Sequence, residues 1–208
     1  MTRMAVAALT VTLLTGCVGQ QEFDITYYNL SAPATGKPAP APKFGSIFVH
    51  DFYVNPSYED KNFNYRTGDL TYETDFYNQF KLSPRMQFTA LTREALKRSG
   101  LFQTILMPES SRVSDYSIAA DVSQFYADFR NPQNPRAVLT VSYNLTRNLR
   151  KGLEHPLLFA KTYSESVPIA KKTADEVARA WDLAFGNITR QFLRDLARVT
   201  PPAAGETQ

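Results

Sequence analysis

The sequence is poor in the residue types that most often carry chemistry. Its 208 residues include one cysteine, two histidines and nine glycines. One cysteine excludes an internal disulfide, and neither His50 nor His155 has a cysteine or histidine at metal-ligand spacing. No P-loop, dinucleotide glycine pattern, G-x-S-x-G or S-x-x-K motif occurs. We therefore expect a protein that is not an enzyme and that has no cofactor and no metal site.

Long apolar runs and concentrated charge are also missing. The apolar segment at residues 4–14 is about half of the roughly 20 residues that a membrane-spanning helix needs. The basic residues are scattered, and the formal net charge is +3. Because no basic patch interleaved with aromatic residues is present, nucleic acid is not an expected partner.

What is present begins with the pattern of a secretory signal peptide. A charged start at residues 1–3, an apolar core at residues 4–14 and small residues before Cys17 are typical of such a segment. We therefore expect residues 1–16 to be removed, which leaves the only cysteine at the start of the mature chain.

The residues Leu14, Thr15, Gly16 and Cys17 together resemble the bacterial lipoprotein lipobox. The resemblance implies that the Cys17 sulfur carries a diacylglycerol and that its new amine is acylated. Two or more acyl chains, at about 0.8 kcal/mol per buried methylene, anchor a protein stably to a membrane. Lipoproteins kept at the inner membrane usually have aspartate after the cysteine, so Val18 implies the outer membrane, facing the periplasm. The alternative is an ordinary cleaved signal peptide with an incidental cysteine.

Residues 17–24 predict a lipidated N-terminus with a short polar leash. The seven residues 18–24 reach at most about 25 Å when fully extended. The domain therefore sits close to its membrane, and any route across the envelope requires a partner.

The sequence from 25 to 199 predicts one α+β domain, and residues 200–208 predict a disordered tail. The strands that we expect lie at 24–30, 45–54, 101–107, 115–122, 137–145 and 157–167, with a hairpin over 62–75 that turns at Thr67-Gly68-Asp69. The last three strands predict an antiparallel meander, with a bulge before Phe125 where the apolar alternation changes phase. The prediction is a two-layer fold with a mostly antiparallel sheet packed by two main helices.

The two helices have recognisable ends. Ser83 is the expected N-cap of the first, Pro84 fits its first turn, and Gly100 fits its C-terminal stop. The apolar residues Met86, Phe88, Leu91, Ala95 and Leu96 are its expected buried face. A capping box at 173–176 starts the second. Its apolar stripe recurs every three or four residues: Val177, Trp181, Phe185, Ile188, Phe192, Leu196 and Val199. The stripe predicts packing on the sheet; a membrane-binding face is the alternative, although the opposite face is mixed rather than strongly basic.

A proline- and alanine-rich linker at 31–43 separates the first two strands. At about 3.1 Å per residue in extended polyproline geometry, it spans up to roughly 40 Å. It is interpreted as a surface linker, or as a segment that lets the first strand pair with a neighbouring subunit in a homo-oligomer.

Several stretches in order resemble one family. They are "TYYNL", "IFVHDFYVNP", "FNYRTGDLTYETDFYNQFKLSP" and "LTREALKRSGLFQTIL", followed by the meander and the final amphipathic helix. This set, over about residues 25–198, resembles the ABC-type transport auxiliary lipoproteins, the PqiC-like outer-membrane partners of MCE-type lipid transporters. The resemblance implies an accessory role without chemistry, in which the lipoprotein docks a periplasmic MCE-type protein and its ABC transporter complex to the outer membrane.

The partner-accessible residues that we expect are the hairpin aromatics Phe63, Tyr65 and Tyr72 together with Arg66, because aromatic and arginine side chains concentrate interface energy. A core role for alternate members of this set is the competing interpretation. Two other functions stay open: a periplasmic lipid-binding shuttle or chaperone, whose aromatics would line a cavity, and a structural lipoprotein of a secretion or envelope assembly.

Overall fold

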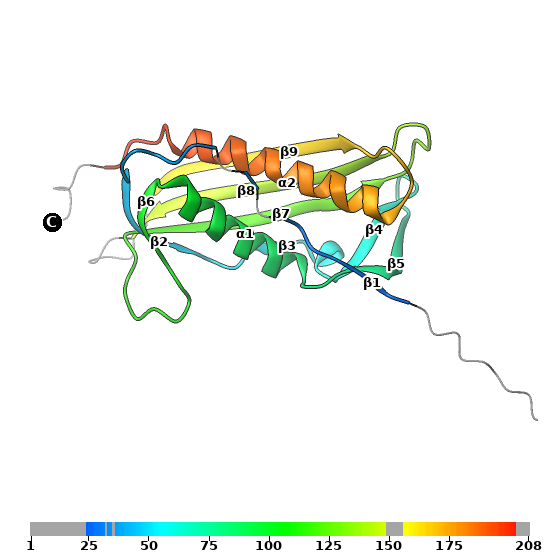
Figure 1. Cartoon of the computed structure of the whole chain (residues 1–208), viewed down its shortest axis with the longest axis horizontal. Helices are drawn as coiled ribbons and strands as arrows, with labels where there is room; N and C mark the ends of the chain where they lie inside the picture. Colours follow the sequence, from blue (N-terminus) through cyan, green and yellow to red (C-terminus); the bar gives the residue numbers. More distant parts are fainter. Residues whose placement is uncertain (1–23, 32, 35, 149–155, 203–208) are drawn as a thin grey trace, which may run out of the picture.

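The computed structural model describes residues 24–31, 33–34, 36–148 and 156–202 (Figure 1). The predicted signal peptide, the lipobox with Cys17, the leash up to residue 23, His155 and the tail from residue 203 lie outside the described residues.

The described chain forms one mixed sheet and two long helices. The strands are β1 (Thr26–Tyr28), β2 (Phe44–Val49), β3 (Tyr53–Val54), β4 (Asn62–Arg66), β5 (Tyr72–Phe80), β6 (Phe102–Leu106), β7 (Tyr116–Asp128), β8 (Arg136–Arg147) and β9 (Leu157–Pro168). The helices are α1 (Pro84–Ser99), α2 (Ala174–Leu196) and one short 3-10 turn, η1 (Pro56–Tyr58). The expected strand at 45–54 is thus divided into β2 and β3.

Strand β7 organises the sheet. It pairs antiparallel with β8 along one edge, and β8 pairs antiparallel with β9, which confirms the predicted meander. Three short strands share its other edge, all parallel to it: β2, then β3, then β4. Strand β6 extends the sheet beyond β2, and β5 and β1 extend it beyond β4. The longest pairings are antiparallel and the parallel ones are short, so the fold is α+β with a mixed sheet.

The predicted bulge in β7 is present. The register with β8 shifts between Val122 and Gln124, so that Phe125 turns inward to the same face as Val122. The hairpin between β4 and β5 also forms as predicted. Its turn is closed by hydrogen bonds from the backbone nitrogens of Thr67 and Gly68 to the carbonyl oxygen of Thr71, at 3.0 and 3.3 Å.

Both helices cover the same face of the sheet (Figure 1). Helix α2 begins at the capping box, where the Thr173 hydroxyl accepts from the Glu176 backbone nitrogen at 3.4 Å. It packs on β8 and β9, while α1 packs beside it on β2, β3 and β6. Helix α1 ends at Gly100, whose φ of 66° is the left-handed conformation expected of a C-terminal stop. Ser83 occupies the N-cap position, but its side chain makes no capping hydrogen bond.

The core between the layers is filled by aromatic rings. Trp181 of α2 is buried, and its ring lies 4.9 Å from Phe63, 4.7 Å from Phe125 and 5.7 Å from Phe80, centroid to centroid. Its indole nitrogen donates to the Tyr126 carbonyl oxygen at 3.2 Å. The α2 stripe therefore packs on the sheet as predicted. On α1, Phe88, Ala95 and Leu96 are buried, Leu91 is half-buried, and Met86 is exposed, so its expected burial is wrong.

The linker at 31–43 lies against both helices. The backbone nitrogen and the hydroxyl of Ser31 donate to the Asp182 carboxylate of α2, each at 2.6 Å. Farther along, the Ala39 nitrogen donates to the Ser99 carbonyl oxygen at the end of α1, at 2.8 Å. The linker thus crosses the helix layer as a strap (Figure 1). Strand β1 pairs in parallel with β5 of its own chain.

Candidate partner surface

The β4–β5 hairpin distributes the four predicted partner residues over two faces of the sheet, because successive side chains of a strand alternate. Phe63 points into the core and is completely buried against Trp181 and Phe80. The expectation that Phe63 is accessible is therefore wrong, and its role is packing.

Tyr65 lies on the same inward face but farther from the core. Its ring is half-buried and meets Phe129 edge-on, 5.4 Å between centroids. Its hydroxyl donates to the Asp75 carboxylate at 2.9 Å. Burial, helped by the hydrogen bond to the Asp75 carboxylate, raises the pKa of Tyr65, so its hydroxyl stays protonated and acts as a donor.

Arg66 and Tyr72 point to the opposite, outer face, where two further tyrosines join them. The guanidinium carbon of Arg66 lies 5.7 Å from the ring centre of Tyr72 and 5.9 Å from that of Tyr126. Tyr58 of η1 completes the group, 5.8 Å from Tyr126 and 6.4 Å from Tyr72, centroid to centroid. Rings at these distances fix the guanidinium through cation–π attraction, worth about 0.5–1 kcal/mol where water has access. We call these four residues the tyrosine–arginine cluster.

Arg66 is also held by the hairpin turn. Its Nε donates to the Gly68 carbonyl oxygen at 3.3 Å, and its Nη2 donates to that of Asp69 at 2.7 Å. The guanidinium thus stabilises the turn by bonding to two of its carbonyl oxygens. The tip beside it presents Leu70, whose surface is 96% exposed.

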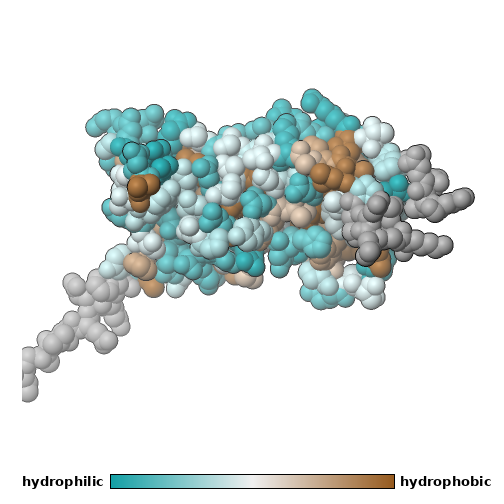
Figure 2. All heavy atoms as spheres, turned by 180° about the vertical axis from the view of Figure 1, so that it is seen from behind, coloured by the Kyte–Doolittle hydropathy of each residue, from teal (hydrophilic) through white to brown (hydrophobic). Residues whose placement is uncertain are grey.

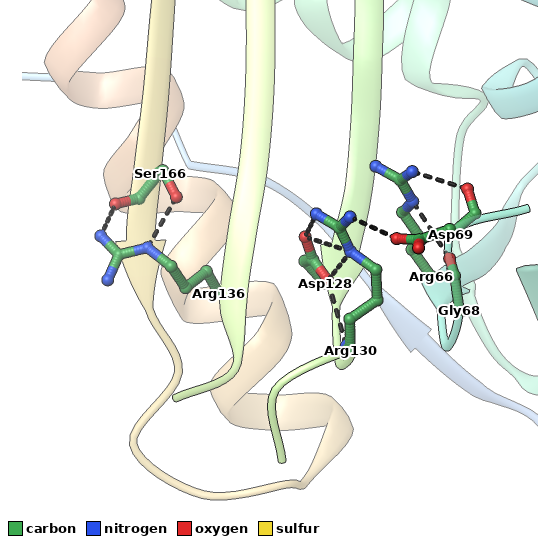
Figure 3. Close-up of polar contacts among 7 residues, drawn as sticks. All are labelled: Arg66, Gly68, Asp69, Asp128, Arg130, Arg136 and Ser166. Atoms are coloured by element: carbon green, nitrogen blue, oxygen red, sulfur yellow. Dashed lines mark hydrogen bonds and ion pairs between the residues drawn. The ribbon is translucent and has the colours of Figure 1, made fainter. Parts of the chain in front are cut away.

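Two more arginines continue this surface across the ends of β7 and β8 (Figure 3). Arg130 bonds to the Asp128 carboxylate at 2.7 Å and to that of Asp69 at 3.0 Å. Arg136 donates to the hydroxyl and the carbonyl oxygen of Ser166 on β9. We call Arg66, Arg130 and Arg136 the arginine row.

The charge of the row is only partly balanced. Hydrogen bonds from Arg130 hold the pKa of Asp128 below its usual range, so this carboxylate is ionised and neutralises one guanidinium. Asp69 is 89% exposed and bonds to the same Arg130. Arg136 is bound to neutral groups of Ser166. The row therefore has a net positive charge beside Tyr72, which is 44% exposed, whereas Tyr58 and Tyr126 are buried beneath it. Positive charge next to an exposed aromatic ring favours an acidic protein partner.

Sequence reasoning missed Tyr58, Tyr126, Asp128, Arg130 and Arg136. These residues come from three separate stretches of the chain. The antiparallel pairing of β7 with β8 sets Arg136 opposite Asp128, and the parallel pairing of β4 with the end of β7 brings Arg66 beside them. One signal was available: the phase shift at the β7 bulge places Phe125 inward and hence Tyr126 outward.

Other kinds of site were also considered within the described part of the chain. None of its helices has the length and apolar character needed to span a bilayer. In the same residues, no three His, Cys, Asp or Glu side chains come together as metal ligands. Asp51, Glu73 and Asp75 do not meet as a carboxylate group: Asp51 contacts Arg93, Glu73 is exposed, and Asp75 accepts from Tyr65 and from the backbone of Tyr77. A cavity of about 670 Å³ lies between the strap and α2, lined by side chains that include Lys37, Arg190 and Arg194.

No protein-family model matches the chain, and no curated protein matches it. Among solved structures, the chain is similar to a DUF330 protein from Xanthomonas campestris, with a TM-score of 0.69, 18% sequence identity, and coverage of 81% of this chain and 92% of that one. The chain shares the fold of this DUF330 protein. It is also similar to the structure of an uncharacterized protein, with a TM-score of 0.62, 14% identity, and coverage of 83% and 99%. The shared fold is consistent with the PqiC-like fold that the sequence motifs imply.

Proposed function

We propose that this protein is a non-catalytic, outer-membrane-anchored lipoprotein that docks an MCE-type periplasmic protein, and with it an ABC transporter complex, to the outer membrane. The observation that carries the proposal is the ordered set of motifs resembling the auxiliary lipoproteins, in a chain with the fold of a DUF330 protein. The lipobox at Leu14–Cys17 supplies the anchor, and the tyrosine–arginine cluster with the arginine row supplies the docking surface.

The packing of the domain favours docking over a lipid shuttle. A shuttle needs an apolar chamber for acyl chains, whereas the aromatic residues here pack on one another. Tyr143 and Phe192, for example, stack at 4.0 Å between centroids with an interplanar angle of 6°. Among the described residues, no aromatic ring lines the cavity beside the strap, whose lining includes polar and charged side chains such as Glu165, Asn187 and Arg194.

The test combines a pull-down from envelope extracts with native mass spectrometry of the detergent-extracted protein. Docking predicts recovery of an MCE-type partner and no stoichiometric phospholipid beyond the Cys17 acyl chains. Native mass spectrometry also reports whether the docking unit is a monomer or a homo-oligomer. A lipid in every domain together with no recoverable partner would reject docking and favour the shuttle.

A matched pair of variants then tests the surface. Arg136→Ser removes one positive charge from the arginine row, and the Arg136 guanidinium donates to neutral groups of Ser166. Arg112→Ser removes one charge from an exposed loop between β6 and β7. We expect the first to reduce partner recovery several-fold, with a weaker dependence on salt, and the second to leave it unchanged. Equal recovery with both variants would exclude the arginine row as the contact.

A further inference from the structure

A group of exposed apolar and aromatic side chains lies where the described chain begins. Ile25 and Tyr27 lie on or beside β1, and Phe76 and Tyr77 on β5; their exposed fractions are 43, 57, 63 and 47%. Figure 2 shows hydrophobic atoms close to the point where the N-terminal trace leaves the domain, and a larger hydrophobic patch toward the opposite end of the same face. We call these four residues the tether-side ridge.

The pairing of β1 with β5 gathers the ridge. Tyr27 pairs with Gln79 in parallel register, so Tyr77, two residues before Gln79, lies on the same face of the ribbon as Tyr27. Tyr28 points the other way, where its ring contacts Phe63 at 5.0 Å and its hydroxyl donates to the Asp175 carboxylate at 2.8 Å. Ile25 lies two residues before Tyr27, and residues two apart in extended chain point to the same face, so Ile25 shares the face of Tyr27.

A bulge in β5 exposes Phe76 and Tyr77. Asn62 of β4 pairs with Gln79, whereas the next residue, Phe63, pairs with Asp75, so β5 carries the three extra residues 76–78 at this point of the ladder. The Asp75 carboxylate fixes this bulge by accepting from the backbone nitrogens of Tyr77 and Asn78, at 2.9 and 3.1 Å. Bulges of this kind re-aim side chains. Here Phe76 and Tyr77 lie in the bulge beside the chain entry, with 63 and 47% of their surfaces exposed.

We propose that the tether-side ridge inserts into the headgroup layer of the membrane that carries the Cys17 anchor. This inference rests on the lipid anchor of the proposed function. Seven Cα-to-Cα steps separate Cys17 from Asp24 by at most about 25 Å, so the β1 end of the domain is the part nearest the bilayer. A tether of this length gives an effective concentration in the millimolar range, which makes even a weak surface contact persistent.

The residue types of the tether-side ridge favour a lipid surface as its binding partner. Tyrosine combines an apolar ring with a polar hydroxyl, and aromatic residues of this kind gather at the level of lipid headgroups. The isoleucine and phenylalanine add apolar area, which is the quantity that sets interfacial binding. A protein partner at this place would have to fit between the domain and its own membrane.

Single-cysteine labelling of the full-length protein tests the inference. Because acylation consumes the thiol of Cys17, a cysteine introduced by Tyr27→Cys or Phe76→Cys is the only free thiol for an environment-sensitive fluorophore. The matched control is Thr26→Cys, one residue from Tyr27 but on the opposite face of β1. The acylated proteins are placed in vesicles of phosphatidylethanolamine and phosphatidylglycerol with nitroxide quenchers on the lipids. We expect blue-shifted, strongly quenched emission from positions 27 and 76, and much weaker quenching from position 26.

Each other outcome overturns a defined part of the inference. Equal quenching at positions 26 and 27 would show proximity from the tether alone, and no quenching at 27 and 76 in vesicle-bound protein would exclude the contact while leaving the anchor intact. A free Cys17 thiol, detected by mass, would remove the anchor and the inference together. Quenching that disappears between about 0.1 M and about 1 M salt, where the Debye length falls from roughly 10 Å to 3 Å, would assign the contact to the arginine row instead of the ridge.

Discussion

At the scale of single residues, Trp181 connects the two layers of the domain. Trp181→Ala is expected to lower the free energy of unfolding by about 3–5 kcal/mol, because it empties a volume enclosed by Phe63, Phe80 and Phe125 and leaves the Tyr126 carbonyl oxygen without its donor. Denaturant unfolding of a chain that begins at Glu22 measures the change. Leu183→Ala, at an exposed position of the same helix, is the control and should change stability by less than about 1 kcal/mol. A similarly small effect of Trp181→Ala would contradict its place in the core.

The Asp75 carboxylate holds the β5 bulge by accepting hydrogen bonds from its backbone. Burial raises the pKa of its carboxyl, but the hydrogen bonds from Asn78, Tyr65 and the backbone of Tyr77 outweigh burial and leave the pKa lowered. A carboxyl with a lowered folded-state pKa contributes stability that is complete above its unfolded pKa, near about 4, and is lost as the pH falls through the folded value.

Asp75→Asn is therefore expected to cost about 1–2 kcal/mol at pH 7, because the amide presents a donor toward groups that already donate. Less stability should be lost between pH 5 and pH 2 than in the parent protein, as urea unfolding at several pH values would show. Glu73→Gln, an exposed change on the same strand, controls for the loss of charge and should have little effect. An unchanged acid profile in Asp75→Asn would mean that other carboxylates set it.

At the scale of elements, the strap is held where it passes the end of α1. A Cβ at Gly100 would lie 3.2 Å from the Ala39 carbonyl oxygen, and its φ of 66° disfavours any side chain. Gly36 has a φ of 77°, and a Cβ added to it would have no atom within 4 Å. The two glycines thus share the left-handed backbone conformation, but only at Gly100 does another backbone segment, at Ala39, lie close to the position of a Cβ.

Gly100→Ala should lower the free energy of unfolding by about 1–2 kcal/mol, the cost of a left-handed residue with a Cβ. Gly36→Ala reports the conformational cost alone, so it should be the milder change. The difference, measured by thermal or urea unfolding, estimates how tightly the strap packs on α1. If the two variants are equally destabilised, the strap adds nothing at this contact.

At the scale of the whole molecule, the proposed function depends on attachment at Cys17. Cys17→Ser is expected to accumulate as an unprocessed precursor without a lipid label, because the serine hydroxyl does not replace the thiol in diacylglycerol transfer. Val18→Asp should keep the lipid but move the protein to the inner membrane in an enteric-type host. Labelled fatty acid and membrane fractionation measure both results. Incorporation of the label by the serine variant would refute lipidation at Cys17.

The end of the molecule that carries β1 also carries the hairpin (Figure 1), so the surfaces proposed for membrane attachment and for docking are neighbours. Both meet on β5: its first residue, Tyr72, belongs to the tyrosine–arginine cluster, and its bulge carries Phe76 and Tyr77. A contact of the ridge with lipid would therefore orient the arginine row relative to the membrane. A partner that binds the row would meet the domain at a defined tilt rather than on a freely rotating leash.

The sequence by itself determined the local elements. The capping box at Thr173 and the stripe through Trp181 predict α2 and its buried face, Gly100 predicts the end of α1, and the alternation in 115–167 predicts the meander, because caps, periods of 3.6 and 2, and turn residues act over a few positions. Tertiary structure alone decided which short strands share the edge of β7. Parallel pairing joins segments far apart in sequence and has no local signature.

For the same reason, the candidate site was only half predictable. The composition of the hairpin indicated Arg66 and Tyr72, but the inward placement of Phe63 and Tyr65 depends on which side of β4 meets α2. Tyr126 and Arg130 join Arg66 only through the pairing of β4 with β7. The strap and the β5 bulge are decided in the same way: the first by contacts with two helices, the second by four hydrogen bonds to Asp75. Such contacts exist only once the chain has folded, so no local pattern in the sequence encodes them.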